Sequence, residues 1–281
     1  MPVLRLPHLP ATAGKQTWGN LPGAALSLAI AEAASAAKRF TLLLTADSQS
    51  ADRLEQELRF FAPELPVLPF PDWETLPYDL FSPHQDIISQ RISSLYRLPE
   101  LDHGILVVPI TTALHRLAPT RFLLGSSLVL DIGQKLDVEQ MRLRLEASGY
   151  RCVDTVYEHG EFAVRGALID LFPMGSKLPY RIDLFDDEIE TLRTFDPETQ
   201  RTVEQIKALN LLPAKEFPFD DAAIARFRDR WHTTFNVDVR RCSVYQDVSS
   251  YIAPNGIEYY LPLFFEKLDS LFDYLPSDAI F

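Results

Sequence analysis

Residues 180–195 have the sequence YRIDLFDDEIETLRTF, in which two segments of alternating side chains flank an acidic turn. Successive side chains of a β-strand point to opposite faces of its sheet. The alternation divides the first segment into an apolar face, Tyr180, Ile182 and Leu184, and a second face, Arg181, Asp183 and Phe185. The sequence therefore predicts an antiparallel hairpin with one face for a core and one charged face that carries a lone aromatic residue.

The same pattern of short alternating segments extends from Leu128 to Leu211, with turn residues between them. One helix interrupts the pattern from Asp137 to Ser148, and Gly149 ends that helix. The predicted strands are 128–132, 152–157, 162–172, 180–185, 189–195 and 203–211. We therefore predict a small α+β domain of antiparallel hairpins over residues 121–213.

The first 120 residues alternate helical and strand signals. Leu26–Ala37 is helical in composition, and a second helix with apolar spacing follows Ser48. The continuous apolar runs Phe40–Thr45 and Ile105–Ile110 are typical of buried parallel strands. Ser82-Pro83-His84-Gln85 combines a capping residue with Pro at the first helical position, which predicts another helix start. We predict an α/β domain with a mostly parallel sheet over residues 1–120.

The last part of the chain, residues 214–281, is predicted to return to this first domain. Pro213–Pro218 has the composition of a linker. A helix is expected from the spacing of Ile224, Phe227, Trp231 and Phe235, and a strand from Ile257–Phe265. The antiparallel domain would then be an insertion in the α/β domain.

Length and charge narrow the function. The chain has 281 residues, enough for roughly two domains, and a formal net charge of −12. Such an acidic chain is a poor candidate for binding the phosphate backbone of nucleic acids, which requires clustered Lys and Arg. No apolar run is long enough for a membrane helix, and Cys152 and Cys242 are too far apart in sequence for a disulfide framework. We expect a cytoplasmic protein, and the apolar end Asp278–Phe281 suggests part of a longer chain.

A phosphate-binding loop is present only in a degenerate form. It needs a glycine-rich turn before a helix, followed by Lys and then Ser or Thr. The one candidate turn contains Gly19 and Gly23, and Ala24 and Ala25 stand where Lys and Ser/Thr are required. An ordinary loop that opens a helix is therefore expected, with no catalytic residue.

Other chemical motifs have structural explanations. Asp186-Asp187-Glu188 could hold a metal ion but is expected to be a solvated turn. Glu158, His159 and Glu161 are expected to form a hairpin turn and not an acid–base cluster, and no His or Cys pair has metal-ligand spacing. The aromatic residues that could stack bases lack interleaved cations and are expected to pack on the sheet; they are Phe70, Trp73, Tyr78 and Phe81.

The charged face of the first hairpin strand leaves two alternatives open. An exposed Phe185 beside Arg181 has the composition of a protein-binding hot spot, which Arg165 could join if its strand pairs nearby. The other possibility is a salt-bridged sheet face with Phe185 covered by a loop.

Six motifs in three parts of the chain resemble a known family. FPDWETLPYD (residues 70–79) and SPHQDI (82–87) resemble the N-terminal region of the bacterial transcription-repair coupling factors, the Mfd family. Arg165-Gly166, DLFP (170–173) and YRIDLFDDEIE (180–190) resemble the module that this family shares with the excision-repair subunit UvrB. GIEYY (256–260) fits the same family, so the resemblance covers essentially the whole chain.

The resemblance implies a degenerate helicase-like (P-loop NTPase-like) domain with an inserted small domain that binds the damage sensor UvrA. The residues that match its UvrA contact are Arg165, Arg181 and Phe185, and we add Gly166, Phe172, Asp183 and Asp187 to the expected surface. Full-length members also have a domain that binds RNA polymerase, an ATP- and Mg²⁺-dependent DNA translocase, and a C-terminal domain that masks the UvrA surface. No cofactor or metal is expected in these 281 residues themselves.

Our leading hypothesis is a non-catalytic module that recruits UvrA to lesions where RNA polymerase has stalled. The alternative is a divergent UvrB-like, nucleotide-dependent enzyme that holds DNA with Trp73 and Tyr78. A third possibility, docking of the same surface on the C-terminal domain of a longer chain, is compatible with the first.

Overall fold

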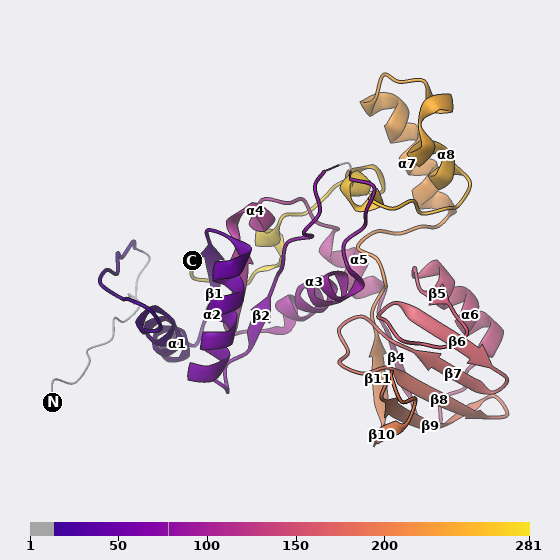
Figure 1. Cartoon of the computed structure of the whole chain (residues 1–281), viewed down its shortest axis with the longest axis horizontal. Helices are drawn as coiled ribbons and strands as arrows, with labels where there is room; N and C mark the ends of the chain where they lie inside the picture. Colours follow the sequence, from indigo (N-terminus) through magenta and orange to yellow (C-terminus); the bar gives the residue numbers. More distant parts are fainter. Residues whose placement is uncertain (1–13, 78) are drawn as a thin grey trace. The chain divides into compact units, whose positions relative to one another are not determined.

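The computed structural model describes residues 14–77 and 79–281. Residues 1–13 and Tyr78 lie outside this range. The chain forms two compact units (Figure 1). Unit 1 comprises the described residues up to Asp72 together with 97–115 and 270–281. Unit 2 comprises 73–96 and 116–269. The predicted boundaries after residues 120 and 213 do not coincide with these units, and the three-domain division stays a prediction.

Unit 1 is built on a parallel sheet. Its three strands are β1 (Phe40–Thr45), β3 (Gly104–Pro109) and β2 (Val67–Pro69), in the order β1-β3-β2. Both pairs are parallel, and Ile280 forms a further parallel bridge with Thr41 of β1. The β3 residues are all buried, as a continuous apolar strand requires. The predicted α/β class is confirmed.

Two helices of unit 1 share a core with this sheet. α1 (Ala25–Ala37) and α2 (Ser48–Phe61) contribute Ala31, Ala34 and Leu58 to a cluster with Val67 and Ile105 of the strands. The carboxylate of Asp47 caps α2 by accepting a hydrogen bond from the Ser50 N–H at 2.7 Å, one residue before the predicted Ser48. The short elements of this unit are η1 (Leu98–Glu100), α4 (Ile110–Ala113) and η4 (Leu271–Tyr274).

The helix after the motif Ser82–Gln85 exists, but its start differs from the prediction. α3 covers Gln85–Arg97 and buries Ile88, Ile92 and Leu95. Ser82 does not cap it. Its hydroxyl instead donates to Glu258 at 2.9 Å and accepts from the Gly256 N–H at 3.0 Å, because the chain near Gly256 passes close by.

The antiparallel domain lies in unit 2 and is a six-stranded sheet in the order β10-β9-β8-β7-β6-β5. All neighbours are antiparallel except β5 and β6. The strands are β5 (Arg151–Cys152), β6 (Glu161–Arg165), β7 (Leu168–Leu171), β8 (Tyr180–Phe185), β9 (Glu188–Phe195) and β10 (Thr202–Ile206). α6 (Val138–Ala147), capped by Asp137, packs beside β5 and β6. The short helix α5 (Thr120–Gly125) precedes this domain.

Three predicted strands are divided or shortened. Residues 162–172 form the β6–β7 hairpin because Gly166 turns the chain at a φ of +63°. Residues 203–211 form parts of two strands. β10 pairs with β9, whereas β11 (Ala208–Leu211) pairs with β4 (Leu128–Asp131). Of the predicted strand 152–157, only Cys152 pairs, at the end of β5.

The predicted linker 213–218 is wrong, because this segment is largely buried. Glu216 is 2 % exposed and accepts a hydrogen bond at 2.6 Å from Nε of Arg91, which is fully buried on α3. The Arg91 guanidinium also lies 5.0 Å from the ring of Trp73. A buried charge requires such a partner, and so the segment is fixed inside unit 2.

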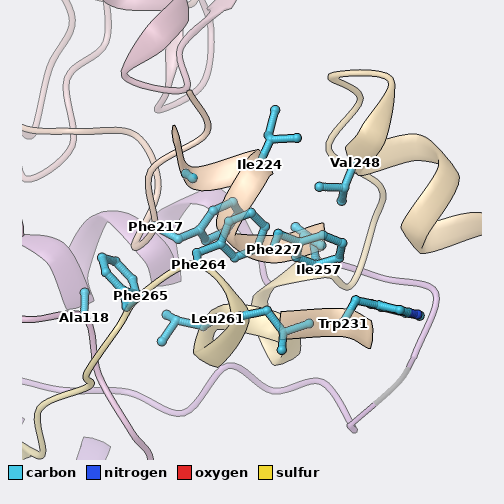
Figure 2. Packing of buried hydrophobic residues seen from close by; sticks show 12 residues of the cluster. Ala118, Phe217, Ile224, Phe227, Trp231, Val248, Ile257, Leu261, Phe264 and Phe265 are labelled. Atoms are coloured by element: carbon cyan, nitrogen blue, oxygen red, sulfur yellow. The ribbon is translucent and has the colours of Figure 1, made fainter. Parts of the chain in front are cut away.

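The next part of unit 2 is a helical cluster around aromatic side chains (Figure 2). Its elements are α7 (Asp221–Thr234), η2 (Val239–Arg241), α8 (Ser243–Ser249) and η3 (Ile257–Leu263). Phe264 packs on Phe217 at a ring distance of 4.8 Å and on Phe227 at 5.0 Å. The predicted α7 face is confirmed. The predicted strand 257–265 is wrong, because η3 contains Pro262, which cannot donate a ladder hydrogen bond.

Removing one partner of the buried pair is expected to destabilise unit 2. Glu216→Ala leaves the Arg91 charge buried without this carboxylate and should lower the free energy of unfolding by about 3–5 kcal/mol. Urea unfolding measures the change. Glu146→Ala removes the exposed partner of Arg142 and serves as the control, with an expected loss below about 1 kcal/mol. Equal effects of the two substitutions would contradict a structural role for the buried pair.

Candidate functional site

One face of the six-stranded sheet carries the charged residues that the alternation predicted. The sheet register pairs Asp170 of β7 with Arg181 of β8, and Arg181 with Arg193 of β9. Because paired residues share a face, these side chains lie side by side across three strands. Ile182 and Leu184 point to the opposite face and are buried, as predicted.

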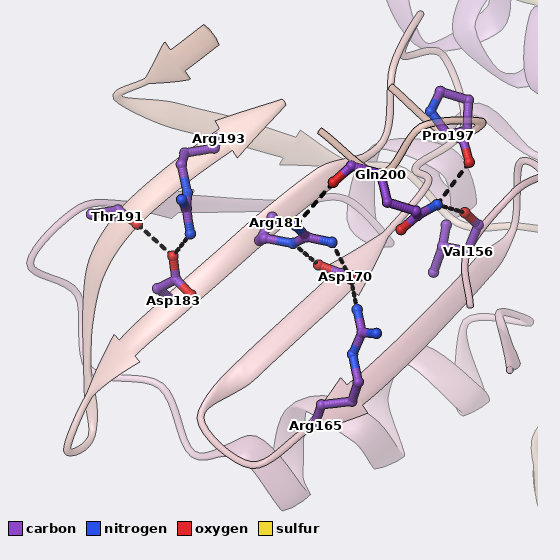
Figure 3. A network of polar contacts seen from close by, with 9 residues as sticks. All are labelled: Val156, Arg165, Asp170, Arg181, Asp183, Thr191, Arg193, Pro197 and Gln200. Atoms are coloured by element: carbon purple, nitrogen blue, oxygen red, sulfur yellow. Dashed lines mark hydrogen bonds and ion pairs between the residues drawn. The ribbon is translucent and has the colours of Figure 1, made fainter. Parts of the chain in front are cut away.

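Asp170 connects the arginines of this face (Figure 3). Its carboxylate is completely buried and accepts two hydrogen bonds from Arg181, at 2.7 Å from Nε and 2.8 Å from Nη2. Nη2 of Arg165, on β6, donates to the same carboxylate. The hydrogen bonds to Asp170 raise the pKa of Arg181 further above its ordinary value. Arg165 and Arg181 therefore belong to one site although β7 separates their strands.

The two arginines differ in their access to solvent. The Arg181 side chain is 16 % exposed, and its guanidinium lies 4.6 Å from the ring of the buried Phe195. The Arg165 side chain is 49 % exposed. Arg165 can reach a partner directly, whereas Arg181 is held within the sheet face.

A second ion pair extends the charged face across β8 and β9. Asp183 accepts hydrogen bonds from Arg193 and, at 2.9 Å, from the hydroxyl of Thr191. The face therefore holds two ion-pair networks, with Asp170 between Arg165 and Arg181 and with Asp183 beside Arg193.

Phe185 ends β8 beyond a register shift after Asp183 and is 73 % exposed. The sequence left open whether Phe185 is exposed or is covered by a loop on a salt-bridged face. In the structure the face is salt-bridged and Phe185 is exposed. Asp187, in the following turn, pairs with Lys135 at 2.8 Å, which lowers the pKa of Asp187 and raises that of Lys135.

Two other expected surface residues differ in position. Gly166 lies in the exposed β6–β7 turn, where its positive φ favours glycine. Phe172 does not reach the surface: it is 6 % exposed and packs with Val156, Ala163 and Phe195. Phe172 therefore belongs to the buried apolar cluster beside the charged residues and offers no surface to a partner.

The degenerate loop lies in unit 1. Gly23 has a φ of +56°, Ala24 is the residue before α1, and Ala25 is its first residue. A mainly apolar cavity of about 620 Å³ lies between α1, β1 and the residues from Gly14 to Trp18, with Lys15 and Arg39 at its wall. Gly19 is exposed and outside this cavity lining.

The turn before β6 is organised by Glu161 and not by an acid–base cluster. Burial alone raises the pKa of Glu161, but hydrogen bonds from the N–H groups of Tyr157 and Glu158 and from Arg151 outweigh it and hold the pKa below its usual value. The part of the chain that the structure describes holds no group of three or more His, Cys, Asp or Glu side chains that could bind a metal ion.

Sequence reasoning did not single out Asp170, Arg193 or Gln200 as members of this site. Asp170 stood in a quoted motif, and a lone carboxylate between Ile169 and Leu171 is a signal of a buried charge. Which side chains pair with Asp170 depends on the register of the neighbouring strands, and this register could not be predicted from the sequence. Gln200 approaches from a turn, with its carbonyl oxygen 3.4 Å from Nη1 of Arg181.

Residues 128–217 match the family model of the UvrB interaction domain. The transcription-repair-coupling factor of Escherichia coli (strain K12) is 51 % identical over 274 residues, which cover 97 % of this chain and 24 % of that protein. The Haemophilus influenzae factor is 49 % identical, and the match covers 94 % of this chain and 23 % of that protein. The Rickettsia bellii factor is 32 % identical, and the match covers 86 % of this chain and 22 % of that protein.

The chain belongs to the transcription-repair coupling factor family, as the resemblance indicated. It spans about a quarter of the length of the curated relatives it matches. Within residues 14–77 and 79–281, no helix has the length and apolar character needed to cross a membrane.

The different exposure of the two arginines predicts different effects on stability. Arg181→Ala removes the two hydrogen bonds that Arg181 donates to the buried Asp170. This substitution is expected to lower the free energy of unfolding by about 2–3 kcal/mol. Arg165→Ala removes a half-exposed pair and should cost about 1 kcal/mol or less. Chemical denaturation of both variants checks this order, and the reverse order would contradict it.

Acid stability is expected to depend on Glu161. Because its folded-state pKa is lowered, the folded state binds fewer protons than the unfolded state, so this carboxylate stabilises the fold at neutral pH. That contribution is lost as the pH falls through and below the group's ordinary pKa of 4.5. Unfolding free energies measured across this range should fall less steeply for Glu161→Gln than for the wild type. Glu158→Gln, at an exposed position in the same turn, should retain the wild-type slope.

Proposed function

We propose that this chain is a non-catalytic, cytoplasmic module that binds UvrA through the charged face of the six-stranded sheet. Its role would be to recruit this damage sensor to lesions where RNA polymerase has stalled. The observation that carries the proposal is the placement of Arg165 and Phe185: both are exposed, on a face whose remaining charges are already paired.

Arg165 would supply the polar contact. One of its terminal nitrogens is engaged by Asp170, so the guanidinium is oriented before a partner arrives, and its other N–H groups remain on the exposed side. Arginine in such a position makes charge-assisted hydrogen bonds to carboxylates. Orientation in advance also reduces the entropy lost on binding.

Phe185 would supply the apolar contact. A phenylalanine that is 73 % exposed at the end of a rigid strand can enter a pocket of a partner with little loss of conformational freedom. Gly166, Asp183 and Asp187 would border this contact, and Arg181 and Phe172 would hold the face in shape from within. The exposed guanidinium of Arg165 favours an acidic group on the partner.

The nucleotide-dependent alternative has less support. Ala24 and Ala25 offer neither a cation for phosphates nor a hydroxyl for Mg²⁺, and Trp73, one of the two side chains that this alternative requires, is buried. We assign ATP and Mg²⁺ use, RNA polymerase and DNA contacts, and the C-terminal domain that would mask this face, to other parts of the longer relatives.

Calorimetric titration of UvrA tests the proposal. Arg165→Ala and Phe185→Ala are each expected to weaken binding by about 2 kcal/mol or more, because each removes a central contact of a small interface. These two substitutions are preferred over Arg181→Ala, whose effect on binding would be mixed with its effect on stability.

Matched controls are available on the same chain. Arg142 has a side-chain exposure of 47 %, close to that of Arg165, and Phe60 is 79 % exposed, close to Phe185. Arg142→Ala and Phe60→Ala should bind like the wild type, and circular dichroism verifies that every variant is folded. Absence of wild-type binding, or equal losses in the controls, would overturn the proposal.

A further inference from the structure

His159 has an arrangement of partners that its neutral form cannot satisfy. It lies in the turn before β6 with a side-chain exposure of 14 %, and its ring contacts that of Phe172 at a centroid distance of 4.0 Å, with the ring planes tilted by 35°. Nδ1 is 2.7 Å from Oδ1 of Asp86, in the first turn of α3. Nε2 is 2.8 Å from the carbonyl oxygen of Ser176, in the loop between β7 and β8.

Both of these partners can only accept hydrogen bonds. A carboxylate and a carbonyl oxygen offer lone pairs, and a neutral imidazole has a single N–H. In either neutral tautomer one ring nitrogen would direct its lone pair at an oxygen less than 3 Å away. The imidazolium form donates to both oxygens at once.

We propose that His159 forms a proton-dependent link, consisting of His159, Asp86 and the Ser176 carbonyl, that fixes the turn before β6 and the β7–β8 loop to the start of α3. Protonation of the ring closes the link and deprotonation opens one of its two hydrogen bonds. The proposal concerns the chain itself and does not depend on UvrA binding.

The charged groups around His159 support this assignment. On α3 and just before it, Asp86 contacts the ring and His84 lies 3.5 Å from the other oxygen of Asp86. In the turn, Glu161 is occupied by Arg151 and two backbone N–H groups, and Glu158 is solvent-exposed near Arg151. Lys177, beside Ser176 in the loop, is exposed. Asp86 is thus the carboxylate that lies within hydrogen-bond distance of the ring.

The link also bears on the base of the charged face. Phe172, under the His159 ring, belongs to the same cluster as Phe195, over which the Arg181 guanidinium lies. A second contact of the β7–β8 loop does not involve a titrating group, since the Gly175 N–H donates to the Ser89 hydroxyl at 2.8 Å. Deprotonation is therefore expected to loosen the loop and not to detach it.

Hydrogen exchange of the full chain at about pH 6 and about pH 8.5 tests the link, because these values bracket histidine titration. After correction for intrinsic exchange rates, the protection of residues 156–161 and 85–89 should fall at least about tenfold at the higher pH, the effect of one charge-assisted hydrogen bond. Protection that does not change with pH would overturn the proposal.

Three variants sharpen the test. His159→Gln should be weakly protected at both pH values. Asp86→Asn should remain protected at the higher pH, because its amide N–H can donate to the neutral Nδ1. His84→Gln, which changes an exposed histidine on the same carboxylate, should keep the wild-type dependence.

An Asp86→Asn variant that loses protection like His159→Gln would indicate a merely structural contact and overturn the proposal. Nitrogen-15 NMR of the His159 ring in the wild type provides an independent readout if a variant fails to fold. A neutral ring at about pH 6 would also overturn the proposal.

Discussion

The charged face depends on one buried carboxylate. Asp170 is completely excluded from solvent, and a buried carboxylate is stable only when its oxygens are paired. Arg181 from β8 and Arg165 from β6 meet that requirement from both sides, so the three strands are tied together at one point. The buried Asp170 therefore fixes the position of the exposed Arg165 side chain.

The side chains of this domain divide by burial into those that hold the charged face in shape and those that are exposed on it. Arg181 lies on Phe195, Phe195 packs with Phe172, and Phe172 contacts the His159 ring, which gives a continuous row of buried contacts beside the charged residues. Arg165 and Phe185, in contrast, have large exposed fractions. The same principle operates between α3 and the segment 213–218, where Arg91 and Glu216 are buried together.

Local periodicity predicted most elements correctly. The parallel strands β1 and β3, the hairpin β8–β9, the helix α6 and the α7 face are where the pattern placed them, to within a residue or two at their ends. Two of the errors share a cause, because each segment depends on a distant partner. The proline-rich segment 213–218 has a linker composition but accepts a buried arginine, and 203–211 divides because its two halves pair with different strands.

The sequence by itself determined which side chains share a face, since alternation along a strand is a property of the backbone alone. It therefore identified Arg181, Asp183 and Phe185 as one group and separated them from the core residues. Only the tertiary structure decided that Asp170 joins Arg165 to Arg181, that Arg193 pairs with Asp183, and that Phe172 lies beneath the surface. These contacts arise from strand register and from loops that fold back over the sheet, so residues distant in sequence become neighbours only when the sheet is complete.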